Sequence, residues 1–466
     1  MPEKKKRKEK DELIVKYEEH LKKSESFFLT EESFEKIIDH YLDDGEISKA
    51  LEAADISLNQ YPYSLDLILA KANIMMQLNN YDEAVELLQS ALNYHPGDEE
   101  ILNTIGICYN VIGEYELALE CFLKILPFAQ NQDEIHYNIG LVYQNLDQYE
   151  EAIEHYKEAI QINIEHEDAL YELAFCLDLI GELEKSISFY KQFIDTDPYS
   201  QSAWYNLGIV YDKLEQFDNA IKAYEYATLI NPKFASAYYN MGNTYISILN
   251  YKEAIECFEK TQQLEGVSPE TYYNIGIAYY NMDKYEKALT YFQKASKLDN
   301  LYHEAWYRAG LCLFNIEKYY QSIHFFNKAL KIDQENGTYW KAVAKAEFQI
   351  GNVISSLDAW DEASQLNPED VEIWMEWSMI YYNQGDNEKA LSIIFFGLEE
   401  LPDNADLMYR ATAYLISAGN YKEAFNYLEN ALILAFDKHE VLFEFFPELE
   451  IQKALYKVIN QYRDNN

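Results

Sequence analysis

The residues best suited to chemistry are five cysteines and nine histidines, whose thiol and imidazole groups serve in zinc sites and as nucleophile and base. The cysteines are separated by multiples of 34 residues: Cys108, Cys176 and Cys312 form one set, and Cys121 and Cys257 form another. His136 and His303 have no cysteine or second histidine at metal-ligand spacing. We therefore expect no metal site and interpret the cysteines as small apolar fillers of a repeated core.

The sequence also gives no support for a glycine-rich phosphate-binding loop or for a pair of catalytic carboxylates. Most of the 16 glycines follow the same 34-residue spacing, which leaves no dinucleotide or phosphate motif. Acidic residues such as Glu100, Glu134 and Asp168 begin predicted helices, where a negative charge favours the helix dipole. We expect no cofactor and no catalytic residue, so the sequence indicates that the protein is not an enzyme.

The net charge of the chain limits the kinds of molecule that it is expected to bind. The 466 residues hold 38 Lys and Arg against 80 Asp and Glu, a formal net charge of −42. Such a chain has few cations to exchange for the counterions of nucleic acids or anionic lipids. It has neither an apolar run of about 18 residues nor a secretory signal. We expect a cytoplasmic protein that neither binds nucleic acid nor inserts into a membrane.

One 34-residue unit, counted from position 1 at Glu31, occurs twelve times up to Lys438 without insertion or deletion. Position 20 carries only alanine or serine, from Ala50 to Ala424. Position 8 is small, with Gly106, Gly140, Gly208, Gly242, Gly276 and Gly310 in six copies. Position 24 is large, with Phe122, Tyr156, Tyr190, Tyr224, Phe258, Phe292, Phe326 and Trp360. Small residues facing rings predict interlocking layers.

Turn and stop signals follow the same period. Position 15 carries Gly45, Gly113, Gly181, Gly351, Gly385 and Gly419, and position 32 carries Pro62, Pro96, Pro198, Pro232, Pro368 and Pro402. Glycine permits a tight turn between two helices, and proline stops the second helix. Each unit is therefore predicted to be helix, turn, helix and stop. Pro127 lies within the expected second helix of the third copy and should end it early, distorting the chain between Ile125 and Asp133.

The unit resembles the tetratricopeptide repeat (TPR), whose pattern is matched nearly throughout by one copy: Trp204, Leu207, Gly208, Tyr211, Ala220, Tyr224, Ala227 and Pro232. The resemblance implies an all-α fold, a right-handed α-α superhelix in which the first helix of each unit lines a concave groove. It also implies that positions 2, 5, 6, 9, 12 and 13 face that groove.

The ends depart from the repeat. We expect a disordered basic tail over residues 1–10, a capping helix over 11–30, twelve units over 31–438 and a degenerate helical cap over 439–466. The Lys4–Lys8 run resembles a nuclear import signal, but such runs are more commonly solvated tails, and we favour that interpretation. A stripe of Leu13, Ile14, Tyr17 and Leu21 is expected to cover the first unit.

The groove implied by the resemblance carries a ladder of phenols and amides. Its candidate peptide-binding residues are Tyr137, Asn138, Tyr171, Tyr205, Asn206, Tyr239, Asn240, Tyr273, Asn274 and Tyr307, together with Arg308 and Arg410. Amides of this kind grip a peptide backbone and the rings pack on its side chains. The alternative is that Tyr and Asn are ordinary repeat composition. The arginines suit a ligand carboxylate, but we favour pairing with Glu304 and Asp406, four residues earlier.

These observations favour a non-enzymatic scaffold that binds peptide segments of other proteins, neutral or basic ones given its acidity. Chaperone-binding TPR domains hold a terminal carboxylate with a clamp of Lys, Asn and Arg. Lys341 and Lys345 occupy two such positions here, but Glu376 replaces the next one, so the clamp is not reproduced. The alternatives are a self-associating structural frame, which would be a homo-oligomer, and a regulatory subunit of an enzyme complex.

Overall fold

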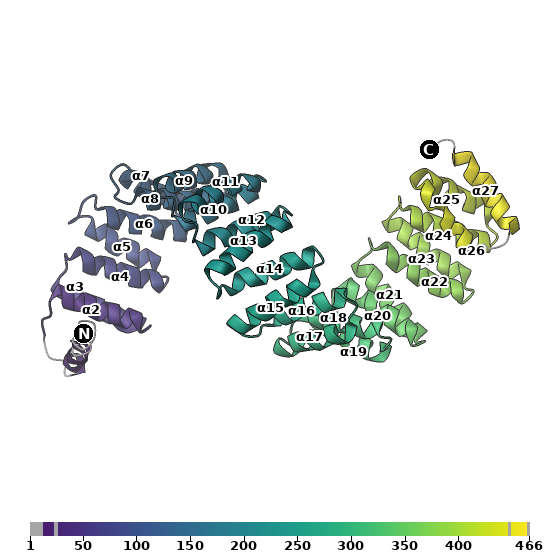
Figure 1. The fold of residues 1–466 in the computed structure, drawn as a ribbon, viewed down its shortest axis with the longest axis horizontal. Helices are drawn as coiled ribbons and strands as arrows, with labels where there is room; N and C mark the ends of the chain where they lie inside the picture. The colour runs from purple at the N-terminus through teal and green to yellow at the C-terminus, as the bar shows by residue number, and fades with distance from the viewer. Residues whose placement is uncertain (1–12, 23–26, 446–448, 464–466) are drawn as a thin grey trace. The chain divides into compact units, whose positions relative to one another are not determined.

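The computed structural model describes residues 13–22, 27–445 and 449–463, and these contain helices and no strand (Figure 1). The chain divides into two compact units, Met1–Pro232 and Lys233–Asn466. The basic tail expected over residues 1–10 lies outside the described residues.

The first unit consists of helix pairs, each joined by a short turn. Its pairs are α2 (Glu31–Asp43) with α3 (Ile47–Gln60), α4 (Leu65–Gln77) with α5 (Tyr81–Ala91), α6 (Glu99–Ile112) with α7 (Tyr115–Ile125), α8 (Gln132–Asn145) with α9 (Tyr149–Ile162), α10 (Glu167–Leu179) with α11 (Ser186–Thr196), and α12 (Gln201–Lys213) with α13 (Phe217–Ile230). A 3-10 turn, η1 (Leu183–Lys185), precedes α11. The helix α7 stops at Ile125, which confirms the early end expected from Pro127.

The second unit continues the pattern and adds a C-terminal segment. Its pairs are α14 (Ala235–Ser247) with α15 (Tyr251–Glu265), α16 (Pro269–Asn281) with α17 (Tyr285–Leu298), α18 (His303–Asn315) with α19 (Tyr319–Ile332), α20 (Gly337–Gln349) with α21 (Val353–Leu366), α22 (Val371–Asn383) with α23 (Asn387–Glu400), and α24 (Ala405–Ser417) with α25 (Tyr421–Leu434). After these come η2 (Phe436–Glu440), α26 (Val441–Phe445) and α27 (Leu449–Arg463).

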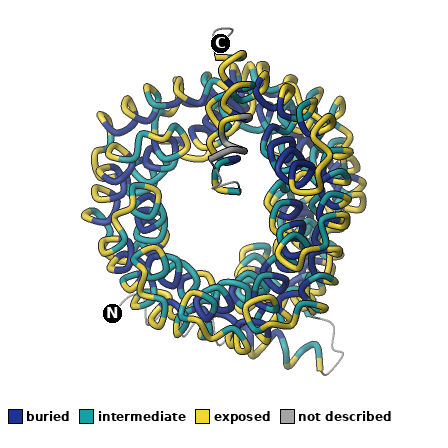
Figure 2. The backbone as a smooth tube through the Cα atoms, turned by 90° about the vertical axis from the view of Figure 1, so that its right-hand side faces the viewer, coloured by how far each residue is buried: buried dark blue, intermediate teal, exposed yellow. Residues whose placement is uncertain are grey.

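Within a pair, the glycine at position 8 lies directly against the ring at position 24. A Cβ atom added at Gly208 would lie 2.5 Å from Tyr224 Cε1, and one at Gly276 would lie 2.6 Å from Phe292 Cε1. In the first pair the sizes are reversed: the larger Ile38 stands at position 8 and the small Ala54 at position 24. Both side chains are buried. The predicted small-to-large packing is confirmed, and it places the core between the two helices of each pair. Buried residues recur along the chain from repeat to repeat (Figure 2).

Position 15 adopts a left-handed backbone whether or not it is glycine. All six predicted glycines there have positive φ, between 72° and 87°. The other six copies use Asn79, Asp147, Glu215, Leu249, Asp283 and Glu317, with φ between 56° and 63°. The turn geometry is therefore imposed by the packing of the two helices, and not by glycine alone. Leu249 is the most strained of these residues by type, since leucine rarely adopts this region.

We expect Leu249→Gly to stabilise the protein by about 1 kcal/mol, because it relieves this strain. The Leu249 side chain is 68% exposed, so little buried surface is lost. The reciprocal variant Gly351→Leu is the matched control, since a Cβ at Gly351 would meet no atom within 4 Å and its φ is 79°. Thermal unfolding followed by circular dichroism should move the two variants in opposite directions. A loss of stability in both would contradict the strain argument.

The two ends are covered by helical segments. The helix over 13–22 packs on α2, with Tyr17 buried and its ring 6.4 Å from those of Phe34 and Tyr41, as its apolar stripe predicts. At the other end, α27 buries Leu455 and Ile459. The helical cap expected over residues 439–466 contains the five-residue α26 and the 15-residue α27. Residues 446–448, which include Phe446 and Pro447, lie outside the described residues.

Candidate functional site

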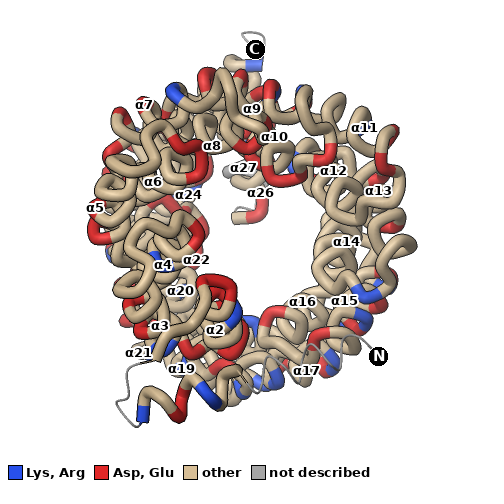
Figure 3. Tube along the Cα trace, turned by 90° about the vertical axis from the view of Figure 1, so that its left-hand side faces the viewer, with Lys and Arg blue, Asp and Glu red and all other residues tan. Residues whose placement is uncertain are grey.

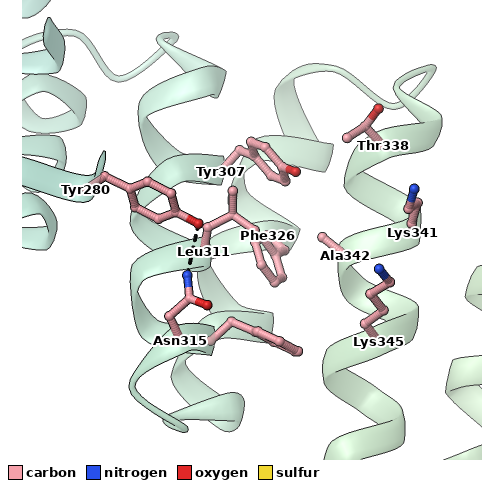
Figure 4. Close-up of a pocket in the computed structure, with 10 residues that line it drawn as sticks. Tyr280, Tyr307, Leu311, Asn315, Phe326, Thr338, Lys341, Ala342 and Lys345 are labelled. Atoms are coloured by element: carbon pink, nitrogen blue, oxygen red, sulfur yellow. Dashed lines mark hydrogen bonds between the residues drawn. The ribbon is translucent and has the colours of Figure 1, made fainter. Parts of the chain in front are cut away.

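Two adjoining cavities form a cleft in the second unit. The first, of about 290 Å³, is lined by Tyr280, Tyr307, Leu311, Phe314, Asn315, Phe326, Thr338, Lys341, Ala342 and Lys345 (Figure 4). The second, of about 350 Å³, is lined by Phe314, Lys345, Phe348, Gln349, Trp360, Glu376, Met379, Ile380 and Asn383. Phe314 and Lys345 line both cavities. The two cavities are therefore continuous, and we call them together the central cleft.

The repeat register explains how the central cleft is built. Its walls come from successive first helices, α16, α18, α20 and α22, and its floor comes from Phe326 and Trp360 on the second helices. In the first cavity, every first-helix residue occupies one of the positions 2, 5, 6, 9, 12 and 13. These are the positions that the TPR resemblance assigned to the groove. The floor residues Phe326 and Trp360 occupy position 24. The same ring that fills the core of a helix pair therefore also forms the bottom of the cleft.

An aromatic row at position 12 lines the cleft with its first three rings and continues beyond it with a fourth. It consists of Tyr280, Phe314, Phe348 and Tyr382, one from each of four successive first helices. Phe348 is the most open of them, with 39% of its surface exposed. Sequence reasoning missed this row because it followed positions 5 and 6. The signal was available, since four successive aromatic residues recur at the repeat period.

The two lysines of the central cleft are already paired. The Lys341 Nζ lies 2.7 Å from an Asp370 carboxylate oxygen and 2.5 Å from one of Glu372, and Lys345 also pairs with Glu372. Burial opposes ionisation of Glu372, but hydrogen bonds from both lysines lower its pKa overall. The cleft therefore presents a neutralised charge cluster, and not two free cations for a ligand carboxylate.

The arginines do not pair with the acids expected to hold them. Glu304 contacts His303, with the carboxylate oxygen 3.5 Å from Nδ1, and Asp406 pairs with Lys438 at 2.7 Å. The Arg308 guanidinium instead lies 6.0 Å from the centre of the Tyr280 ring. The helix spacing allowed the expected ion pairs. In the structure, however, the carboxylates contact other basic residues and the guanidinium groups lie against aromatic rings. The predicted pairing of Arg308 with Glu304 and of Arg410 with Asp406 was wrong.

The predicted tyrosines serve partly as packing. The rings of Tyr205, Tyr239, Tyr273 and Tyr307 lie 5.5 to 5.9 Å from the position-24 ring of their own repeat, and Tyr137 lies 6.0 Å from Tyr156. These tyrosines are half-buried, whereas Tyr171 is 52% exposed. Of the ladder, only Tyr307 reaches the central cleft. Tyr171 and Asn206 instead share a smaller cavity of about 130 Å³ in the first unit.

The predicted asparagines link neighbouring repeats. Asn138 donates to Asn103 Oδ1 at 3.2 Å, and Asn274 donates to the Tyr239 hydroxyl at 3.1 Å and to Asn243 Oδ1 at 3.0 Å. Asn240 lies half-buried on α14 of the second unit. The ladder is therefore partly a set of contacts between repeats, and its amides are not all turned to solvent.

A second set of polar contacts joins position 12 of one repeat to position 13 of the next. Asn145 donates to Asn110 Oδ1 at 2.9 Å, Asn315 donates to the Tyr280 hydroxyl at 2.9 Å, and the hydroxyls of Tyr382 and Ser417 lie 3.1 Å apart. An ion pair joins Lys213 to Asp178 at the same positions. We call these contacts the margin clasps. Their partners are 35 residues apart, so a search for the 34-residue period alone misses them.

Four of the five cysteines have raised pKa values, and His136 lies beside His155 with their Nδ1 atoms 3.0 Å apart. Burial raises the pKa of Cys108 and Cys121 to about 11 and that of Cys176 and Cys312 to about 12, which disfavours the reactive thiolate. Over 13–22, 27–445 and 449–463, no three His, Cys, Asp or Glu residues converge as a metal site would require. The same residues form no helix long and apolar enough to span a membrane. Asp and Glu residues are spread over the helices (Figure 3).

Family models described as tetratricopeptide repeat match residues 134–166, 168–200, 202–234, 235–265, 269–300 and 303–336. A model described as the N-terminal TPR repeats region of Psidin matches residues 36–140. The chain is a tetratricopeptide-repeat protein. The TPR helix pairs described above agree with this family. No protein of curated function matches the sequence.

Several solved structures are similar to parts of the chain. YrrB, described as a TPR protein with an unusual peptide-binding site, is 22% identical, with 40% of this chain and 94% of that chain covered and a TM-score of 0.35. The Cut9–Hcn1 complex is 14% identical, with 83% and 97% covered and a TM-score of 0.37. MamA from Desulfovibrio magneticus RS-1 is 19% identical, with 37% and 97% covered and a TM-score of 0.35. TPR arrays are protein-interaction scaffolds, and this protein shares that general role.

Proposed function

We propose that this TPR protein binds a peptide segment of a partner protein along its first helices, with the central cleft as the main contact in the second unit. The observation that carries the proposal is the continuous cleft, built at the groove positions of four successive repeats and floored by Phe326 and Trp360. Sites of this kind combine an apolar lining with a few polar groups that orient the ligand. Asn315, Gln349 and Asn383 supply such groups here.

The chemistry of the lining favours a segment with apolar side chains. The aromatic row offers rings at the spacing of successive repeats, and amides beside it pair with the backbone of an extended peptide. The predicted ladder in the first unit, at Tyr171 and Asn206, extends the proposal to a second contact there. The net charge of −42 attracts basic segments, leaves neutral ones unopposed and repels acidic ones. The groove needs no catalytic group for this role.

Replacing Phe348 with alanine is expected to weaken partner binding by about tenfold or more, because burying a phenylalanine ring contributes about 1.5 to 3 kcal/mol. The measurement is capture of partner from native lysate on immobilised protein, followed by titration of the purified partner. Phe396→Ala is the matched control: Phe396 is also exposed, by 53%, but lies on the second helix α23. Equal loss in both variants, or in neither, would remove the cleft from this role.

A further inference from the structure

The short helix α26 packs against the first helices α22 and α24 of the second unit (Figure 1). Its last residue, Phe445, meets the Tyr382 ring edge to face, with centroids 5.8 Å apart, and the Tyr414 ring at 6.2 Å. The Arg410 guanidinium lies 4.9 Å from the centre of the Phe445 ring. We call Tyr382, Arg410 and Tyr414 the aromatic subsite. Phe445 occupies it with a ring that remains half-buried.

The aromatic subsite belongs to the groove by its register. Tyr382 is the fourth member of the aromatic row, and Arg410 occupies position 6, which is a groove position. Arg410 also approaches Met379 Sδ at 3.8 Å, and Met379 lines the second cavity of the central cleft. The aromatic subsite therefore lies next to the central cleft along the same groove. A segment lying in the central cleft and continuing along the first helices meets Phe445 there.

Neighbouring residues of the same segment behave differently. Phe443 stacks on Tyr456 of α27, with centroids 4.5 Å apart, and also meets His439, so it packs within the C-terminal segment. Leu442 is fully buried. Leu455 and Ile459 hold α27 in place independently of Phe445. Phe445 is thus the residue of the C-terminal segment whose ring lies in the groove. Truncating its side chain leaves the other contacts that anchor this segment intact.

We infer that the aromatic subsite receives an aromatic side chain of the bound partner segment, and that Phe445 is its internal occupant until the partner displaces it. This inference rests on the proposed function and deepens it by naming the side chain that the partner must carry. Edge-to-face rings and a cation over a ring are both favourable for an aromatic guest. Because Phe445 is tethered, it competes at a high effective concentration. The partner therefore binds less tightly than the open groove would allow.

The test uses the full chain and a fluorescein-labelled peptide of its own residues 436–445, FDKHEVLFEF. Peptide binding, measured by fluorescence anisotropy, is expected to be about tenfold tighter to a Leu442→Ala/Phe445→Ala chain than to the unchanged chain, because the vacated site no longer has a tethered competitor. A peptide carrying Phe445→Ala should not bind. Adding Arg410→Ala to the double variant should weaken binding again by about tenfold.

Controls separate this inference from a folding defect and from the proposed function. Phe445→Ala alone should also increase peptide binding, whereas Phe443→Ala should not, and circular dichroism must show native helix content in each variant. Equal peptide affinity for the unchanged and open chains, or binding indifferent to Arg410→Ala, would overturn the inference. If the Phe348→Ala effect on partner capture still holds in that case, the groove function stands and only the aromatic subsite is lost.

Discussion

Replacing Trp360 with alanine is expected to lower the free energy of unfolding of the second unit by about 3 to 5 kcal/mol. Trp360 is 2% exposed on α21, where it packs in the core and forms part of the cleft floor. Truncation removes buried apolar surface and leaves a cavity that the neighbouring helices only partly fill. Urea unfolding followed by far-ultraviolet circular dichroism measures the loss. The variant should also bind the partner more weakly, because the second cavity loses its floor.

Trp360→Phe is the matched control for this prediction. Among the described residues, no acceptor bonds the buried Trp360 Nε1, so phenylalanine removes an unsatisfied donor along with some surface. Position 24 already carries phenylalanine at Phe258, Phe292 and Phe326. We therefore expect Trp360→Phe to cost less than about 1.5 kcal/mol. Similar losses for alanine and phenylalanine would show that the ring at this position does not support the core.

The second large effect is expected from Gly276→Val, at about 2 to 3 kcal/mol of lost stability. A Cβ atom at Gly276 would lie 2.6 Å from Phe292 Cε1, and the Phe292 ring is fully buried, so it has no free space to enter. The helices α16 and α17 must move apart, which opens the core on either side. Chemical unfolding of the purified variant gives the measurement.

A compensating change tests the cause. Phe292→Leu alone should destabilise the protein, but in the Gly276→Val background it should restore part of the lost stability, because the smaller side chain admits the new methyl groups. The coupling energy in this double-mutant cycle is expected to be about 1 kcal/mol or more. Additive losses would mean that Gly276 matters for a reason other than the ring it faces.

The packing frame was predictable because each element of it is local or repeats. A glycine and a ring sixteen residues apart, as in Gly276 and Phe292, lie on the two helices of one pair, so a single period places them together. The early end of α7 followed from Pro127 in the same way. The positive φ of Leu249 was not predictable from residue type, because the packing of two helices overrides the preference of leucine.

The candidate site was only partly predictable. The resemblance assigned the groove positions that line the first cavity, but residue type could not show that Tyr205 and Tyr273 lean on core rings. The expected partner of Arg410 was a helix neighbour, whereas the structure brings Phe445 from beyond the last repeat. Such contacts depend on how the C-terminal segment folds back, and the repeat pattern carries no information about that segment.

The margin clasps have a mechanical consequence. Each joins one repeat only to its neighbour, as Asn315 does with the Tyr280 hydroxyl, and each is a single polar contact at the end of a helix. A pull on the ends of the array would load these junctions in series, and an individual contact of this strength yields at little energetic cost. The clasps should therefore give way first under tension, while the buried apolar contacts between neighbouring helix pairs still hold.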